Sequence, residues 1–191
     1  MRERLARAGV LAFGAAGLLM LVSVSLIAML RLGLPIPAWS IPLPAILAQL
    51  ATLAGLATLF SLAPRNQVLF ARTGLAATLV AVGVIIAGAA WLIIAASEGP
   101  PPGIVGLAAA FIGCHMVAFI ANALALRGLE RTGKTIALCL LVPPLLSGVM
   151  IGVALVHGME TALSLDLYTN AGTGIALLCT AAMLRRVPIC A

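Results

Sequence analysis

The chain has 191 residues, of which 63% are hydrophobic and only 8% are charged. A soluble domain carries about a quarter charged residues, so this composition excludes a globule covered with polar surface in water. The net charge of +6 comes from short basic clusters beside apolar segments, which is typical of membrane proteins and argues against nucleic acid as a partner. The composition therefore predicts an all-α, polytopic integral membrane protein whose first partner is the lipid bilayer.

Six apolar segments follow one another along the chain, each about as long as the 20 residues that a helix needs to cross hydrocarbon. The first five contain no acidic or basic residue, whereas the sixth has Asp166 and Asn170 near its start. We expect the sixth helix to begin near Leu165, with Asp166 in the lipid headgroup layer. The chain is therefore predicted to be a single transmembrane domain over residues 1–191, a bundle of six helices. The expected spans are residues 10–30, 41–62, 74–96, 104–126, 136–156 and 165–184.

Proline marks two of the connections and one unusual helix. The proline-rich residues 33–44 and 98–103 separate the first and second segments and the third and fourth. Pro143 and Pro144 instead lie inside the fifth segment. Since proline lacks the amide donor of a helix interior, we expect a kink or a local break there, with neighbouring helices satisfying the freed carbonyl groups.

The basic residues predict the orientation. With six spans, only Arg31 lies on the side away from the termini. The positive-inside rule then places both termini in the cytoplasm and the protein in the cell (cytoplasmic or inner) membrane. Trp39, Trp91 and Tyr168 map to the opposite boundary, where aromatic residues are enriched. The basic residues on the side of the termini are Arg2, Arg4, Arg7, Arg65, Arg72, Arg127, Arg131, Lys134, Arg185 and Arg186.

A short motif recurs at the cytoplasmic start of each odd-numbered segment. It reads Arg-Ala-Gly at residues 7–9 and Arg-Thr-Gly at residues 72–74 and 131–133. This spacing is that of three repeated helical hairpins of about 60 residues. Positive-inside topology alone also places arginine at each of these ends, so both explanations stay open.

Small residues at four-residue spacing favour close contact between helices in lipid. Such contacts either pack one bundle internally or dock it to a partner subunit, and the sequence leaves both open. The spaced residues are Gly148 and Gly152, Gly83 and Ala87, and Ala8, Ala12 and Ala16.

Three polar residues are candidates for a site inside the membrane. His115 lies near the middle of the fourth segment and shares a helical face with Asn122. Gln49 lies at a similar depth in the second segment, so depth allows a hydrogen bond between Gln49 and His115. An ionisable residue at this depth is by default a candidate functional site. His115 is therefore either a structural residue satisfied by a neighbouring helix, part of a solute pathway, or a cofactor ligand.

Cofactor, metal and catalytic chemistry find little support. The second histidine, His157, lies at the outer end of the fifth helix, too far from the depth of His115 for a haem held by two histidines. The four cysteines form no CxxC pair, and His and Cys never cluster at the spacing of metal ligands. No GxSxG, HExxH or Walker motif is present. We therefore expect no cofactor, no metal site and no catalytic residue.

Two functions remain from different classes. The first, which the sequence favours, is a non-catalytic integral subunit of a larger membrane complex, with other membrane subunits as partners. The alternative is a small transporter or channel with a polar site around His115 and Gln49. In size, in its six helices and in the proline-rich residues 33–44, the chain resembles substrate-binding membrane components of vitamin uptake transporters. A membrane enzyme comes third.

Overall fold

The computed structural model describes residues 2–37, 40, 42–94, 104–129 and 131–187, and nearly all of them are helical. Each of the six α-helices is long and apolar enough to cross a membrane. The all-helical prediction is therefore confirmed for the described residues. The helices are α1 (Arg2–Arg31), α2 (Pro42–Leu59), α3 (Val68–Ile94), α4 (Ile104–Leu126), α5 (Arg131–His157) and α6 (Met159–Leu184), with the short 3₁₀ helices η2 (Phe60–Leu62) and η3 (Arg65–Gln67) between α2 and α3.

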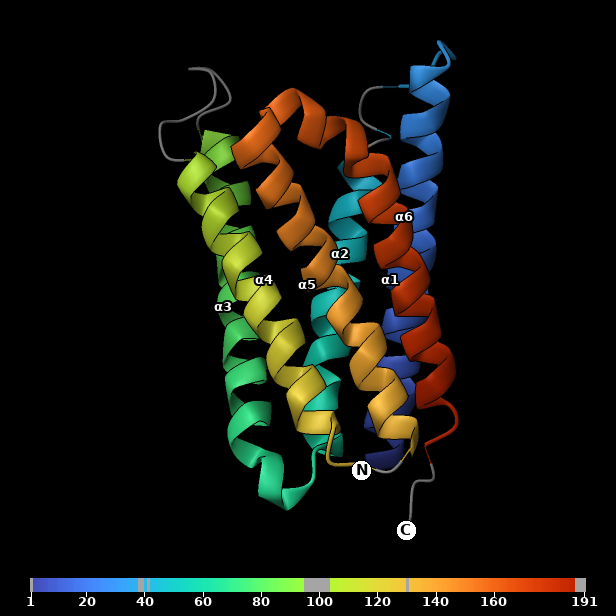
Figure 1. Ribbon diagram of the computed structural model, residues 1–191, viewed down its shortest axis with the longest axis vertical. Helices are drawn as coiled ribbons and strands as arrows, with labels where there is room; N and C mark the ends of the chain where they lie inside the picture. Colours follow the sequence, from blue (N-terminus) through green and yellow to red (C-terminus); the bar gives the residue numbers. More distant parts are fainter. Residues whose placement is uncertain (1, 38–39, 41, 95–103, 130, 188–191) are drawn as a thin grey trace.

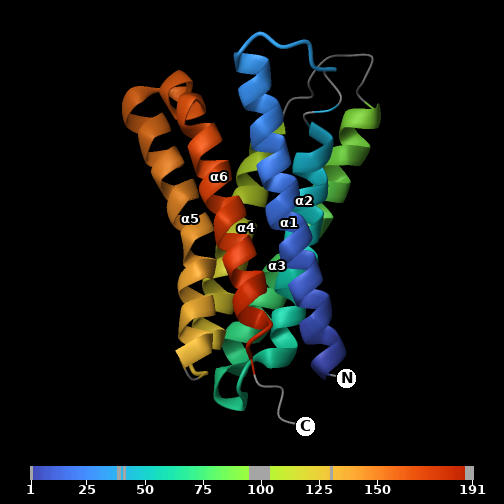
Figure 2. The same cartoon turned by 90° about the vertical axis from the view of Figure 1, so that its right-hand side faces the viewer.

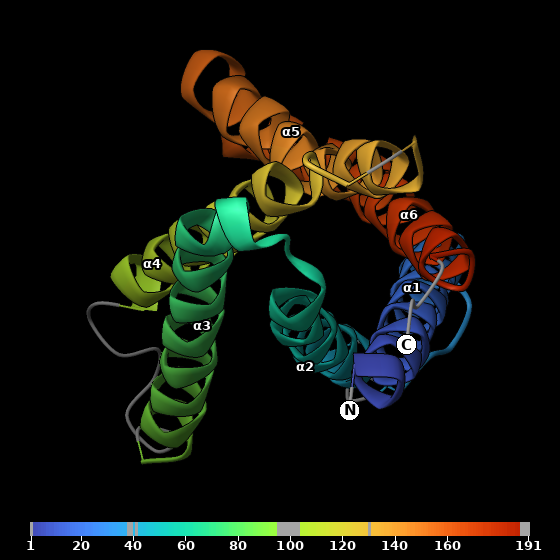
Figure 3. The ribbon, with the colours of Figure 1, turned by 90° about the horizontal axis from the view of Figure 1, so that it is seen from below.

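The helices stand side by side in one bundle, and the start of α1 and the end of α6 lie at the same end of it (Figure 1). We name this end the terminal end and the opposite one the distal end. Helix α1 packs against α2 and α6, α5 packs against α6 and α4, and α4 packs against α3. Seen along the bundle, the helices therefore follow the order α2, α1, α6, α5, α4, α3, with a smaller contact between α2 and α3 (Figure 3).

The helices extend beyond the apolar segments at the terminal end. Helix α1 begins at Arg2, α3 at Val68 and α5 at Arg131. Arginine and lysine are good helix formers, so a helix continues through a charged stretch until a breaking residue ends it. Hydropathy alone identifies the apolar part of each helix and misses these charged turns.

The expected start of the sixth helix near Leu165 was wrong. Helix α6 begins at Met159, and Gly158 alone separates it from α5. Gly158 has a φ of +86°, which glycine adopts without steric cost. Asp166 therefore lies about two turns inside α6 rather than at its N-terminus.

Of the kink or local break expected at Pro143 and Pro144, the break does not occur, because α5 is assigned as one helix from Arg131 to His157. Both prolines are buried. Of the aromatic residues expected at the distal boundary, Tyr168 is 70% exposed, whereas Trp39 and the side chain of Trp91 lie outside the described part of the structure.

The well-packed core occupies only the terminal half of the bundle. Each of its largest fully buried apolar side chains lies in the half of its helix that is nearer the terminal end. Toward the distal end the helices diverge (Figure 2). The bundle is thus closed at one end and looser at the other. These core residues are Phe13, Leu53, Leu56, Leu59, Phe119, Leu126, Ile136, Leu140 and Leu177.

Glycines bring α1 and α6 together at the border of this core. A Cβ atom added to Gly17 would lie 2.7 Å from the carbonyl oxygen of Gly174, which is closer than real Cβ atoms come. Of the small residues singled out in the sequence, Ala16 is buried in the core, whereas three glycines are not. No atom lies within 4 Å of a Cβ added to Gly83, Gly148 or Gly152, so these three face away from the bundle.

Candidate functional site

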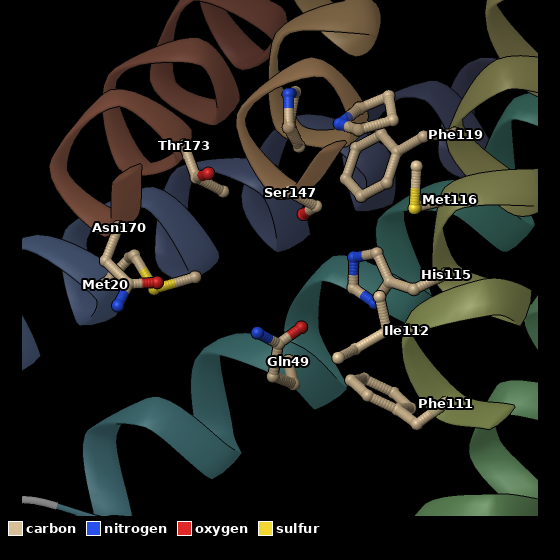
Figure 4. Close-up of a pocket in the computed structure, with 12 residues that line it drawn as sticks. Met20, Gln49, Phe111, Ile112, His115, Met116, Phe119, Ser147, Asn170 and Thr173 are labelled. Atoms are coloured by element: carbon tan, nitrogen blue, oxygen red, sulfur yellow. The ribbon is translucent and has the colours of Figure 1, made fainter. Parts of the chain in front are cut away.

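A cavity of about 120 Å³ lies among α1, α2, α4, α5 and α6, beside the inner edge of the core. Five polar side chains line it, namely Gln49 of α2, His115 of α4, Ser147 of α5, and Asn170 and Thr173 of α6. Figure 4 shows these side chains around one space. Met20, Met116 and Phe111 supply apolar lining between them. The structure therefore brings two of the three sequence candidates, His115 and Gln49, to one cavity.

The imidazole of His115 is held by two aromatic rings of its own helix. Phe111 meets it edge-on at a centroid distance of 5.2 Å and an angle of 74°. Phe119 stacks on it at 4.9 Å and 30°. These residues lie four positions before and after His115, so the helix repeat places all three rings on one face. The rings fix the orientation of the imidazole without satisfying its polar atoms.

Two polar atoms at the cavity are buried and have no hydrogen-bond partner, Nδ1 of His115 and Oε1 of Gln49. The hydrogen bond between Gln49 and His115 that their depth allows is therefore not formed through these atoms. Buried polar atoms are nearly always paired in proteins. Oδ1 of Asn122 is also buried and unpaired but does not line this cavity, whereas the atoms of His115 and Gln49 share it, so one bound molecule would supply a partner to both.

A second cavity of about 200 Å³ lies next to the first, and Ile112, Ser147, Asn170 and Thr173 line both. It extends along α5 and α6 to Asp166. There Nδ2 of Asn170 donates a hydrogen bond of 2.8 Å to Oδ1 of Asp166. Since α6 starts at the distal end, the two cavities lead from His115 toward that end of the bundle.

The structure places Asn122 apart from His115 and Gln49. Its side chain is 1% exposed, and its Nδ2 donates a 2.8 Å hydrogen bond to the carbonyl oxygen of Ala118. A Cβ added to Gly74 of α3 would lie 2.7 Å from the same Nδ2. Asn122 therefore packs α4 against α3 in the terminal half and does not line either cavity described above.

The sequence reasoning missed the contribution of α5 and α6 to the cavity. Asp166, Asn170 and Thr173 are spaced by four and three residues, which places them on one helical face. That spacing was a usable signal in an apolar segment. Ser147 lies one turn after the two buried prolines and carried no comparable signal.

Reactive groups are scattered rather than clustered in the described residues. No group of three His, Cys, Asp or Glu side chains there could hold a metal ion. Cys114, Cys139 and Cys179 are free thiols, and Cys190 lies outside the described residues. His157 is exposed, as the last residue of α5. What the cavity offers chemically is hydrogen bonding and a carboxylate at its distal extension, which suit binding.

Comparison of the chain with protein-family models, with curated proteins and with solved structures finds no match.

Proposed function

We propose that the protein is a multi-pass membrane protein that binds a small polar solute around His115 and Gln49, as a small transporter or its substrate-binding membrane component. The observation that carries this proposal is the pair of buried, unpaired atoms on one cavity, Nδ1 of His115 and Oε1 of Gln49. Leaving a buried polar group unpaired costs about 1–3 kcal/mol. A solute with complementary groups would remove both penalties. The sequence favours a subunit of a larger complex, whereas these unpaired atoms support the alternative, a small transporter.

The lining of the cavities limits the class of solute. It consists of amide, hydroxyl and imidazole groups, with the carboxylate of Asp166 in the second cavity. Among the residues that the structure describes, no lysine or arginine lines either cavity. An anionic solute would meet a like charge at Asp166 without a compensating base. The proposed solute is therefore neutral or cationic, carries hydrogen-bond donors, and has a small carbon skeleton that contacts Met20, Met116 and Phe111.

The charge distribution supports an orientation for this cavity. Arg31 ends α1 at the distal end, and the other basic side chains that the structure describes lie at the terminal end. Under the positive-inside rule the terminal end lies on the cytoplasmic side of the cell membrane. The cavities then extend toward the outer side, and the packed core separates them from the cytoplasm. The basic side chains at the terminal end are Arg4, Arg7, Arg65, Arg72, Arg127, Lys134, Arg185 and Arg186.

The proposal is tested by comparing the full chain with the double variant Gln49→Leu/His115→Leu. Each purified protein is screened for thermal stabilisation by small amines, amino alcohols and neutral amides, and extracted for co-purifying small molecules. We expect at least one compound that stabilises or accompanies the parent chain and not the double variant. Thr73→Val is the control, because Thr73 is exposed and bonds only within its own helix, to Leu69. A solute retained equally by all three proteins would contradict the site.

Outward-facing small residues favour a second candidate function, that of an integral subunit of a larger membrane complex. Gly83 and Ala87 on α3 and Gly148 and Gly152 on α5 are all exposed. In lipid, such surfaces permit close approach of another helix. Purification in mild detergent followed by mass measurement tests this function: a stable larger assembly that is lost on Gly148→Leu supports it, and a monomer in both cases counts against it. A substrate-binding component would satisfy both candidates at once.

A further inference from the structure

A groove of about 430 Å³ runs along the outside of the contact between α1 and α6, near the terminal end. Gly14 and Leu18 of α1 and Leu178, Ala181 and Ala182 of α6 line its apolar length. Arg185 and Arg186 line its end. The groove is separate from the cavity of His115, since the two share no lining residue.

Small side chains create this groove. The backbones of α1 and α6 meet at Gly17 and Gly174, and α1 and α6 lie side by side in the view along the bundle (Figure 3). Next to this crossing, Gly14, Ala181 and Ala182 are too small to fill the furrow between the helices. Leu18 at its edge is 59% exposed. The groove therefore opens outward, to the lipid that surrounds a membrane-crossing bundle.

The two arginines lie where α6 ends. The helix closes at Leu184, and the backbone amides of Arg185 and Arg186 donate to the carbonyl oxygens of Ala181 and Met183, at 3.3 and 2.9 Å. These bonds fix the backbone, while both side chains are exposed. The described acidic side chains, Glu160 and Asp166, belong to the distal part of α6. No described carboxylate is therefore near enough to neutralise the pair.

We propose that this groove binds one anionic phospholipid, with an acyl chain along Gly14, Leu18 and Ala182 and its phosphate at Arg185 and Arg186. An apolar channel that ends in two cations matches the two parts of such a molecule. Guanidinium groups bind phosphate through charge-assisted hydrogen bonds. Basic residues at the membrane surface attract anionic lipid, by about fivefold in binding constant for each residue. A partner helix would fill the apolar part without using the charges, and free phosphate would leave the apolar part empty.

The test measures lipid adducts on the detergent-purified full chain by native mass spectrometry. Phosphatidylglycerol and phosphatidylcholine with the same acyl chains are titrated in parallel. We expect phosphatidylglycerol to bind more tightly, and Arg185→Gln/Arg186→Gln to weaken its binding by about 25-fold, as two fivefold effects predict. Arg65→Gln/Arg127→Gln is the matched control, since these two arginines are exposed at the same end and line no part of the groove. Its phosphatidylglycerol binding should equal that of the parent chain.

A second variant examines the apolar part without changing charge. Ala182→Phe places a ring in the groove at an exposed position, so it should displace the lipid while the protein stays folded. Leu138→Phe, on an exposed face of α5, is its control and should have no effect. Equal binding of the two lipids, equal loss in both arginine pairs, or displacement by millimolar inorganic phosphate would overturn the proposal. A dimer lost on Ala182→Phe, in place of a lipid adduct, would assign the groove to a second copy of the chain.

Discussion

At the scale of single residues, the unpaired atoms of His115 and Gln49 lower the stability of the folded protein. Both side chains line a cavity in a bundle whose other interior contacts are mostly apolar. Leucine at either position would remove an unpaired polar atom and lose no hydrogen bond from Nδ1 or Oε1. Polar residues that weaken the folded state in this way are expected where binding requires them.

His115→Leu and Gln49→Leu should therefore weaken solute binding without lowering the stability of the folded protein. We expect each variant to keep or raise the apparent melting temperature in detergent, because up to about 1–3 kcal/mol of desolvation cost per group disappears. Solute binding should fall at least tenfold. The measurements are a thermal unfolding curve and a binding titration on the same preparation. A marked loss of stability with unchanged binding would make His115 a structural residue.

Asn122 should respond differently, because it lines neither of the two polar cavities and Gly74 packs against its amide. Gly74→Ala would place a methyl group 2.7 Å from Nδ2 of Asn122. We expect a loss of about 1–3 kcal/mol, the usual cost of overpacking, read as a lower unfolding midpoint. Gly83→Ala is the control, since nothing lies within 4 Å of its added Cβ, and it should be neutral. Asn122→Ala should rescue part of the Gly74→Ala loss; no rescue would mean that the two residues do not compete for space.

At the scale of helices, the crossing of α1 and α6 depends on one glycine pair. A methyl group at Gly17 would lie 2.7 Å from the backbone oxygen of Gly174, so it forces the two helices apart. Gly17→Ala should lower stability by at least about 1–3 kcal/mol, measured by thermal unfolding in detergent. Gly152→Ala faces open space and should leave the midpoint unchanged. Similar effects for both variants would show that this crossing is not the tight contact.

Hydropathy predicted the helices well and their ends poorly. The apolar runs identify all six helices because lipid selects for twenty or so apolar residues in each. Residues 159–165 lie in α6 although the sequence analysis placed them before the sixth helix, since Gly158 alone makes the reversal. The repeat of three hairpins stays a prediction.

The sequence predicted some residues of the site and not others. The depth of His115 and Gln49 follows from helix rise, which is why both reach one cavity. Asn122 shares the helical face of His115, yet it packs against α3. Which neighbour each turn of α4 faces depends on tertiary contacts, and the sequence of one helix does not encode these contacts. Ser147 joins the site only because α5 continues through Pro143 and Pro144.

At the scale of the whole molecule, packing is uneven along the bundle axis. The buried core fills the terminal half, and the two polar cavities extend from its edge toward the distal end. Under the proposed function, cavities that lead toward one end of the bundle and a core that closes the other end correspond to one state of a transporter.

Labelling of introduced cysteines checks this asymmetry. In a chain with Cys114, Cys139, Cys179 and Cys190 replaced by alanine, Ser147→Cys should react with a membrane-impermeant maleimide added outside the cell. Leu56→Cys should not react from either side, because Leu56 is 0% exposed in the core. Labelling of Ser147→Cys from the cytoplasmic side alone would reverse the proposed orientation.

The single residue between α5 and α6 constrains how fast such a site could exchange its solute. These two helices pack along each other and are tied at the distal end by Gly158. They cannot separate there, so closing the distal side would require both to swing together as a rigid body against α1, α2 and α4. One collective motion of this kind takes microseconds to milliseconds. We expect that swing to govern the residence time of the solute. A longer connection at Gly158 should therefore give a shorter residence time.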